Sequence, residues 1–221
     1  MRTSGPEPAG QNPPGELLAD RAYTALRDQI VTLAIPPGAP INEDALGRAL
    51  QMGRTPVREA IKRLALENLV SVFPRRGTFA SEINITDLAH ISDVRVQLEG
   101  HAAYRAAERL TPSQCAELDA LDAEIDGGGG DAAQLMDLDA RIHRFVYRCA
   151  GNPYLQETLE RYLNLSLRIW YLVLERLPHL FDRVHEHREL LAAIRLKEPE
   201  RAQAIAAEHV AIFEREIRGV L

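Results

Sequence analysis

The sequence predicts a mainly α-helical protein with a small mixed N-terminal domain and a larger helical C-terminal domain. Three observations support this fold class. Helix-forming alanine, leucine, glutamate and arginine are abundant among the 221 residues, and only 5% are aromatic. Strand-like patterns occur only near residues 70–81. Each segment after residue 86 has helical periodicity, bounded by helix start and stop signals.

The N-terminal domain is expected to begin with three helices. The first carries an apolar stripe and stops before Pro36-Pro37-Gly38. The second follows Asn42, a good N-cap, and has Glu43 and Asp44 in its first turn. The third has Pro56 at its first position, where a missing N–H costs nothing. The expected spans are Leu17–Leu33, Asn42–Leu50 and Thr55–Asn68, the last with Thr55 as its N-cap.

A β-hairpin is predicted after the third helix. Val70–Phe73 and Thr78–Ser81 form its two short strands, and Pro74–Gly77 joins them. Helix, helix, short turn, helix and basic hairpin is the layout of a winged helix-turn-helix. We therefore expect a DNA-binding domain at residues 16–83, preceded by a disordered, proline-rich tail at residues 1–15.

The charge distribution favours the same interpretation. Seven basic and two acidic residues lie between Arg48 and Ala80, whereas the whole chain has a net charge of −6. A basic island on an acidic chain is typical of a phosphate-binding surface, although a solvated charged face has the same composition. The third helix would enter the major groove and the hairpin would reach the neighbouring backbone. The candidate DNA-binding residues are Arg48, Arg54, Thr55, Arg58, Lys62, Arg75, Arg76 and Gly77.

The C-terminal domain, residues 84–221, is expected to be a bundle of six helices. The breaks between them contain glycine or proline, for example Gly127–Gly130 and Pro199. No strand pattern occurs in this part of the sequence. The expected helices are 86–109, 112–126, 131–150, 153–174, 178–197 and 199–219.

Four polar residues of this bundle have a spacing that is compatible with a metal site. Asp139 and His143 are four residues apart and share one helical face, flanked by apolar residues. The last two helices would form a hairpin near Glu198, with His187 eleven residues before it and His209 eleven residues after it. Three imidazoles and one carboxylate are a common ligand set for a divalent metal. A hydrogen-bonded core histidine is the alternative at each position.

Arg95 and Glu99 form another pair at helical spacing. They fit an ordinary helical ion pair. They also fit an inward arginine that clamps the carboxylate of a small-molecule effector, with Arg95 as the binding residue. The sequence leaves both interpretations open.

The residues Arg54–Leu64 (RTPVREAIKRL), together with Glu67–Val70 and Pro74–Phe79, closely resemble the recognition helix and wing of GntR-type regulators. The second domain resembles the FCD ligand-binding domain of the FadR-like branch, and its six helices are similar to the VanR-type subgroup. The residues that carry this second resemblance are Arg95, Glu99, Asp139, His143, Ala150–Asn152, His187 and His209.

The resemblance implies a homodimeric regulator, most often a repressor, that binds a palindromic DNA operator and a small carboxylate effector. In metal-containing members, one aspartate and three histidines hold the ion, and these map onto Asp139, His143, His187 and His209. Zinc is the expected ion, with nickel and manganese as alternatives. Two departures affect the operator: Gly53 replaces a common serine or threonine, and Asp44 stands where some members have an arginine.

Two other functions remain open at this stage. The ion itself could be the effector, which would make the protein a metal sensor. A metallohydrolase is the second alternative, because a bound metal can lower the pKa of its water, but the sequence offers no dedicated general base and we expect no enzyme. A cytoplasmic location is expected, since no apolar run approaches the length of a membrane helix and Cys115 and Cys149 form no motif.

Overall fold

The computed structural model describes residues 17–127, 130–176 and 180–221. Contacts divide the chain into two compact units. Of the described residues, the first unit comprises those up to Ile30 together with Ala34–Ser81, and the second comprises Val31–Leu33 together with those from Glu82 onward. The tail expected at residues 1–15 lies outside the described residues.

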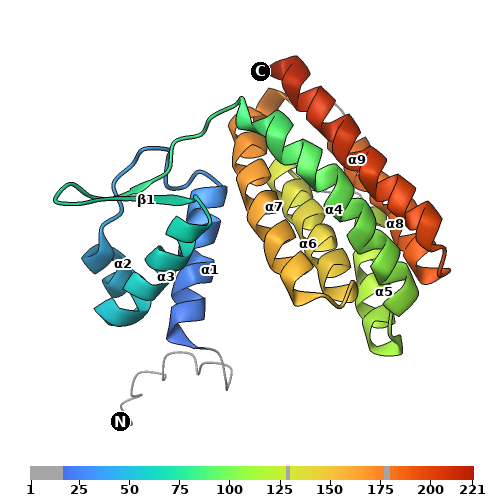
Figure 1. The fold of residues 1–221 in the computed structure, drawn as a ribbon, viewed down its shortest axis with the longest axis horizontal. Coiled ribbons are helices and arrows are strands. Elements are labelled where there is room, and N and C mark those ends of the chain that lie inside the picture. Colours follow the sequence, from blue (N-terminus) through green and yellow to red (C-terminus); the bar gives the residue numbers. More distant parts are fainter. Residues whose placement is uncertain (1–16, 128–129, 177–179) are drawn as a thin grey trace, which may run out of the picture. The chain divides into compact units, whose positions relative to one another are not determined.

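The first unit is a winged helix-turn-helix, as the sequence predicted (Figure 1). Its core forms because α1 and α3 each bury one apolar stripe against the other elements. The buried side chains are Ala22, Leu26 and Ile30 of α1, with Val57, Ile61 and Leu64 of α3. The elements are α1 (Leu18–Val31), α2 (Glu43–Ala49), α3 (Arg54–Leu66), β1 (Val70–Phe73) and β2 (Gly77–Ala80).

The start of α3 differs from the prediction. Asn42 caps α2 as expected, because its side chain accepts a hydrogen bond from the Ala45 N–H at 2.9 Å. In α3, however, Gly53 is the N-cap and Thr55 lies inside the first turn. Pro56 is still tolerated there, because the first N–H groups of a helix have no intrahelical acceptor.

The hairpin pairs its strands in antiparallel register, from Val70 opposite Ala80 to Phe73 opposite Gly77. The second strand therefore begins one residue earlier than predicted. Gly77 has φ +107°, a conformation that side chains disfavour, so the glycine is required by the turn itself. Residues 39–41 also pair with β2, through bonds such as Ile41 N–H to Thr78 C=O at 2.8 Å. This short third segment was not predicted.

In the described part of the second unit, all regular structure is helical, as predicted (Figure 1). The observed ends lie within about two residues of the expected ones, and a 3-10 turn (Leu174–Arg176) extends α7. The expected start at Pro178 lies outside the described residues. The helices are α4 (Asp87–Arg109), α5 (Pro112–Asp126), α6 (Ala132–Cys149), α7 (Pro153–Val173), α8 (Leu180–Arg195) and α9 (Pro199–Val220).

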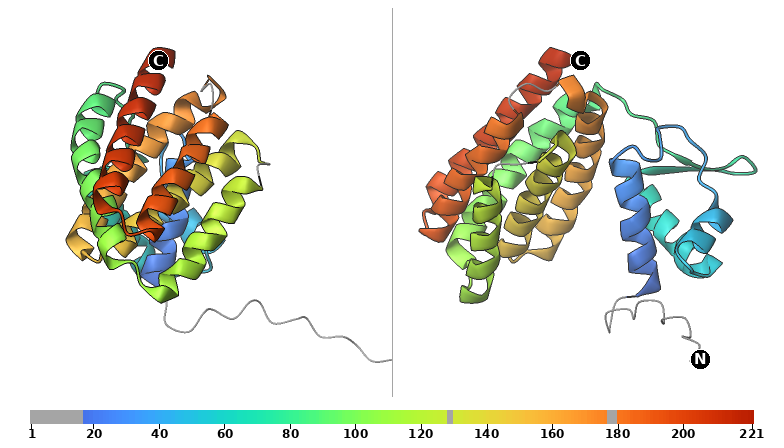
Figure 2. Two further views of the ribbon diagram at one scale, coloured as in Figure 1. Left: turned by 90° about the vertical axis from the view of Figure 1, so that its right-hand side faces the viewer. Right: turned by 180° about the vertical axis from the view of Figure 1, so that it is seen from behind.

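Helix α6 occupies the middle of the bundle and contacts α4, α5, α7 and α8. Helix α4 packs closely along α9, and α8 and α9 run side by side as a hairpin (Figure 2). Gly100 permits the α4–α9 approach, because a Cβ at this position would lie 3.2 Å from the Gln203 carbonyl oxygen. The packing brings inward side chains of α4, α6, α8 and α9 to one place. No helix among the described residues is long and apolar enough to cross a membrane.

Candidate metal centre and nucleic-acid interface

The four predicted metal ligands converge inside the bundle. Asp139 and His143 lie on α6, His187 on α8 and His209 on α9, and each is at most 6% exposed. The Nε2 atoms of His187 and His209 are each 3.7 Å from Asp139 Oδ1, and His143 Nε2 is 3.8 Å from Asp139 Oδ2. One ligand atom from each residue lies within 4.8 Å of the other three. The sequence spacing therefore identified residues that are neighbours in space.

These atoms have the chemistry of a metal site. Asp139 Oδ2 and the Nε2 atoms of His143, His187 and His209 are buried and lack hydrogen-bond partners. Buried polar atoms in proteins nearly always have a hydrogen-bond partner. Several unpartnered ligand atoms in one place are therefore compatible with a site that binds a cation. Two ligands about 2.1 Å from a common ion lie roughly 3.0–3.4 Å apart in octahedral or tetrahedral geometry. The aspartate–histidine spacings of 3.7–3.8 Å lie just above this range.

Glu99 on α4 orients one of the four ligands. Its Oε2 lies 2.6 Å from His143 Nδ1. Because an ionised carboxylate only accepts hydrogen bonds, Nδ1 carries the proton and the lone pair of Nε2 points toward the cluster. Metal-binding histidines are commonly held by a carboxylate in this way, which also makes the imidazole a better ligand.

Glu99 is itself fixed by two further side chains. Arg95 donates to Glu99 Oε1 through Nε at 2.8 Å and through a terminal nitrogen, and the Tyr147 hydroxyl donates to the same oxygen at 2.7 Å. Burial raises the pKa of the Glu99 carboxyl, but Arg95, His143 and Tyr147 lower it more, so this pKa lies well below its usual value. Glu99 is therefore an ionised acceptor in the core.

Arg95 is the residue that we expected either to form an ion pair or to clamp an effector. The structure shows the ion pair: the side chain is 1% exposed and binds Glu99. Its guanidinium also lies over the Trp170 ring, 5.1 Å from the centroid. Effector binding by Arg95 stays a prediction, and it requires donors that Glu99 does not use.

Burial also favours the neutral form of His187. The pKa of His187 lies well below its ordinary value, first because burial disfavours the charged form and second because His209 and His143 are close. The His187 and His209 ring centroids are only 4.3 Å apart. Neutral imidazole is the form that binds metal, so His187 is in the form that a cation requires.

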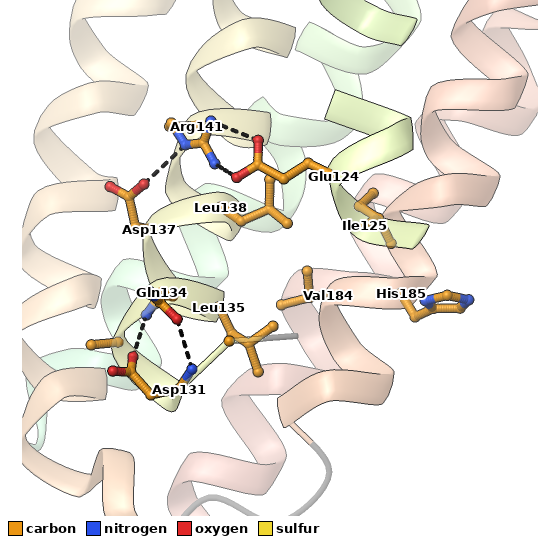
Figure 3. A pocket seen from close by; sticks show the side chains of 12 residues that line it. Glu124, Ile125, Asp131, Gln134, Leu135, Asp137, Leu138, Arg141, Val184 and His185 are labelled. Carbon is orange, nitrogen blue, oxygen red and sulfur yellow. Dashed lines mark hydrogen bonds and ion pairs between the residues drawn. The ribbon is translucent and has the colours of Figure 1, made fainter. Parts of the chain in front are cut away.

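The described part of the second unit also contains a surface pocket of about 470 Å³ between α5, α6 and α8 (Figure 3). None of the four predicted ligands lines it. Arg141 bridges Glu124 and Asp137 across this pocket, and Asp131 and Gln134 cap α6 (Figure 3). His185 is exposed here, whereas His187, two residues later, faces the core. Within the pocket, Arg141 is thus already paired with Glu124 and Asp137, and Asp131 with Gln134.

The predicted DNA-binding residues all lie on the surface of the first unit. Arg54, Thr55, Arg58 and Lys62 are exposed on α3, and Arg48 is exposed at the end of α2. Arg75, Arg76 and Gly77 form the exposed hairpin tip. Basic side chains therefore lie both on α3, the expected recognition helix, and on the wing formed by the hairpin.

Two of these arginines have acidic partners from α2. Arg54 donates to both carboxylate oxygens of Asp44, from Nε at 2.9 Å and from Nη2 at 3.2 Å. Arg58 donates from Nε to Glu43 at 2.9 Å. The sequence indicates Glu43 and Asp44 only as acidic residues in the first turn of a helix, and it does not predict these pairs. Likewise Glu99 and Tyr147 were not identified as support for the metal ligands. No sequence pattern signals these particular contacts, whose partners are 10 to 48 positions apart.

The fold and the two sites together define a winged helix-turn-helix protein whose second unit carries a buried ligand set. Residues 18–80 match "Bacterial regulatory proteins, gntR family", and residues 90–211 match the FCD domain. The chain belongs to the GntR family, as its motifs indicated, and is a DNA-binding transcriptional regulator.

Relatives with curated names agree with this assignment. The chain is 30% identical to the HTH-type transcriptional regulator McbR of Escherichia coli K12 over 187 residues, which cover 83% of this chain and 85% of McbR. It is 23% identical to the HTH-type transcriptional repressor RspR of the same organism, over 94% of this chain and 92% of RspR. It is 32% identical to the Nta operon transcriptional regulator of Aminobacter aminovorans, over 60% of this chain and 62% of that protein.

Solved structures show the same fold. The structure of E. coli McbR/YncC superposes with a TM-score of 0.81 at 27% identity and covers 92% of this chain and 98% of its own. A GntR-type regulator from Rhodococcus sp. RHA1 superposes with a TM-score of 0.68 at 20% identity, over 92% of this chain and 98% of its own. The second likeness supports the fold only.

Proposed function

We propose that this regulator is a repressor whose operator binding is controlled by a small carboxylate at a metal site in the second unit. It would act in the cytoplasm as a homodimer on a palindromic operator, since a two-fold protein presents two recognition helices to two half-sites. The observation that carries the metal part of this proposal is the convergence of buried, unpartnered ligand atoms from Asp139, His143, His187 and His209.

On the DNA side, α3 would lie in the major groove. Arg54 and Arg58 at its N-terminal end would reach base edges, while Thr55 and Lys62 would bind the flanking phosphates. Arg48 would contact the backbone from α2. Arg75 and Arg76 at the wing tip would reach the adjacent backbone or minor groove, and Gly77 would allow the wing to approach closely.

On the effector side, the four ligands would hold one divalent ion, zinc by preference and nickel or manganese otherwise. When bound, the ion supplies a Lewis-acidic position that accepts a carboxylate oxygen. The effector would add to these four ligands, so the ion would have to accept a fifth one, as zinc can and as nickel and manganese do. Arg95 is the candidate partner for the effector's charge, through donors that Glu99 leaves free.

Glu99 offers a route from the effector site to the DNA-binding unit. It holds His143 on one side, and it lies on α4, the helix that follows the linker between the two units. An effector that changed the position of His143 would act on α4 through this contact. The effector can shift DNA binding only by as much as its affinity differs between the two arrangements.

Elemental analysis of the purified protein tests the metal site. About one divalent ion per chain is expected in the unmodified protein, and essentially none in the His187→Ala/His209→Ala variant. His185→Ala is the matched control, because His185 is exposed on the same helix. Absence of metal from the unmodified protein, even after reloading with zinc, nickel or manganese, would contradict the proposal.

A second experiment tests the effector's dependence on the metal. Chelating organic acids are titrated against a DNA complex of the protein and of the His187→Ala variant. Release or tightening of DNA only in the unmodified protein is expected. A normal effector response in the variant would show that the metal has a structural role alone.

One observation favours a second candidate function, in which the ion itself is the effector. All four ligands are buried, and the surface pocket of about 470 Å³ does not reach them. Titrating the apo-protein and DNA with metal, without any organic acid, separates the two functions. A large change in DNA affinity from metal alone would favour the sensor.

A further inference from the structure

The ion pair between Asp44 and Arg54 has a geometry that bears on how DNA sequence is read. Asp44 lies in the first turn of α2, and Arg54 is the first residue of α3. Both side chains are exposed, at 51% and 69%, so the pair contributes nothing to the core. Asp44 accepts from Nε and from Nη2 of the arginine, one bond to each carboxylate oxygen. The pair is therefore bidentate.

A guanidinium group has two edges that can form paired hydrogen bonds. One edge carries the hydrogens of Nε and Nη2, and the other carries those of Nη1 and Nη2. Asp44 occupies the first edge of Arg54. The second edge is the one that can donate to O6 and N7 of a guanine, the commonest arginine–base contact in the major groove. Asp44 thus leaves the base-reading edge of Arg54 unused.

This arrangement has two consequences for binding. An arginine that is already held by a carboxylate has lost part of its rotameric freedom, so less is lost when it meets a base. Asp44 also brings a negative charge close to the DNA backbone, which weakens binding to every sequence. Only DNA with a guanine at the right position offsets that repulsion, so the pair favours discrimination over affinity.

Arg58 provides an internal comparison. Its partner Glu43 accepts only from Nε, at 2.9 Å, so the guanidinium can still rotate about a single hydrogen bond. Arg54 is the more firmly oriented of the two arginines. The geometry at Arg54, rather than the general acidity of α2, is what points to base reading.

We propose that Asp44 is a specificity-determining residue, which orients Arg54 toward a guanine and disfavours DNA that lacks one. Asp44 is a positioning residue and makes no base contact itself. The inference rests on the proposed function in one respect, namely that the N-terminal end of α3 enters the major groove.

The experiment is selection of binding sites from a randomised duplex DNA library by the full-length protein. Four proteins are compared: the unmodified chain, Asp44→Asn, Arg54→Ala and Glu59→Gln. Glu59 is exposed on α3 and has no ion pair with any described residue, so its variant makes the same charge change without touching Arg54. Affinity for a duplex without a selected site is measured alongside.

The expected results distinguish the effect of the Asp44 charge from its effect on the orientation of Arg54. Asp44→Asn should bind unselected DNA several-fold more tightly, because a negative charge is removed. Its preference for guanine at the position read by Arg54 should fall several-fold, and by less than in Arg54→Ala, which removes the bidentate contact itself and should cost about tenfold. Glu59→Gln should raise the affinity for unselected DNA and leave the base preference unchanged.

The other outcomes overturn the inference in distinguishable ways. If Arg54→Ala loses the guanine preference but Asp44→Asn keeps it, Asp44 acts through charge alone and only this inference fails. If Arg54→Ala selects the same sites as the unmodified protein, Arg54 reads no base and this inference fails, whereas base reading by Arg58 on α3 is not contradicted. Enrichment of no sequence by the unmodified protein would overturn both this inference and the proposed role of α3.

Discussion

The molecule contains two arginine–carboxylate pairs that use the same chemistry in opposite surroundings. Arg95 and Glu99 are 1% and 3% exposed within the second unit, whereas Arg54 and Asp44 are 69% and 51% exposed on the first. Each arginine contributes Nε and Nη2 to its partner. The buried carboxylate also accepts a hydrogen bond from His143, one of the candidate metal ligands, whereas the exposed pair faces solvent. A buried pair of this kind holds neighbouring core side chains in place, whereas an exposed pair remains accessible to a binding partner such as DNA.

The largest expected effect follows from breaking the buried pair. Arg95→Met leaves the Glu99 carboxylate in the core without its cation, and should lower the free energy of unfolding by about 3–5 kcal/mol. Urea denaturation followed by circular dichroism measures this change. Arg201→Met, which breaks the exposed pair with Glu198, is the control and should cost less than about 1 kcal/mol. Equal losses in both variants would contradict the comparison.

Metal binding is expected to have the next largest effect. An ion present at 100 times its dissociation constant stabilises the native state by about 2.7 kcal/mol. For a chain of this size, Tm should then rise by roughly 5–10 °C. Thermal melts with added zinc, nickel or manganese test this prediction, with the His187→Ala/His209→Ala variant as the control. The same rise in the variant would place the ion elsewhere.

Removing charge from the wing should have a smaller effect. Arg75→Ala/Arg76→Ala eliminates two expected phosphate contacts, so the slope of log affinity against log salt should become shallower by about 1.8. Fluorescence anisotropy on one duplex at several salt concentrations gives the slope. Arg201→Ala/Arg215→Ala on α9 removes the same charge from the other unit and should leave the slope unchanged. If both variants made the slope equally shallower, the wing would contribute no more to phosphate binding than α9 does.

The smallest effect concerns the exposed pair. Asp44→Asn should change the free energy of unfolding by less than about 1 kcal/mol, because solvent screens an exposed ion pair and its side chains lose entropy when they pair. Urea denaturation again provides the measurement. A loss as large as that of Arg95→Met would mean that the pair supports the fold, and its proposed role in recognition would lose its basis.

Local signals predicted most of the secondary structure. Asn42, Asp131 and Asn152 accept hydrogen bonds from backbone N–H groups at the starts of α2, α6 and α7, as N-caps do. The start of α3 was predicted wrongly because Gly53 caps it without any side chain. Segment 39–41, which pairs with β2, was missed because three residues have too little pattern to indicate a strand.

The sequence by itself determined the fold class, the family and the four candidate metal ligands. Periodicity and helix caps act over a few residues, and the hairpin of the last two helices places His187 and His209 at equal depth by counting alone. Only the tertiary structure decided which charges pair. Glu99 binds His143 from 44 residues away, and Asp44 meets Arg54 across the turn between α2 and α3. Such contacts depend on how helices pack and which side chains become buried, and no local pattern records that outcome.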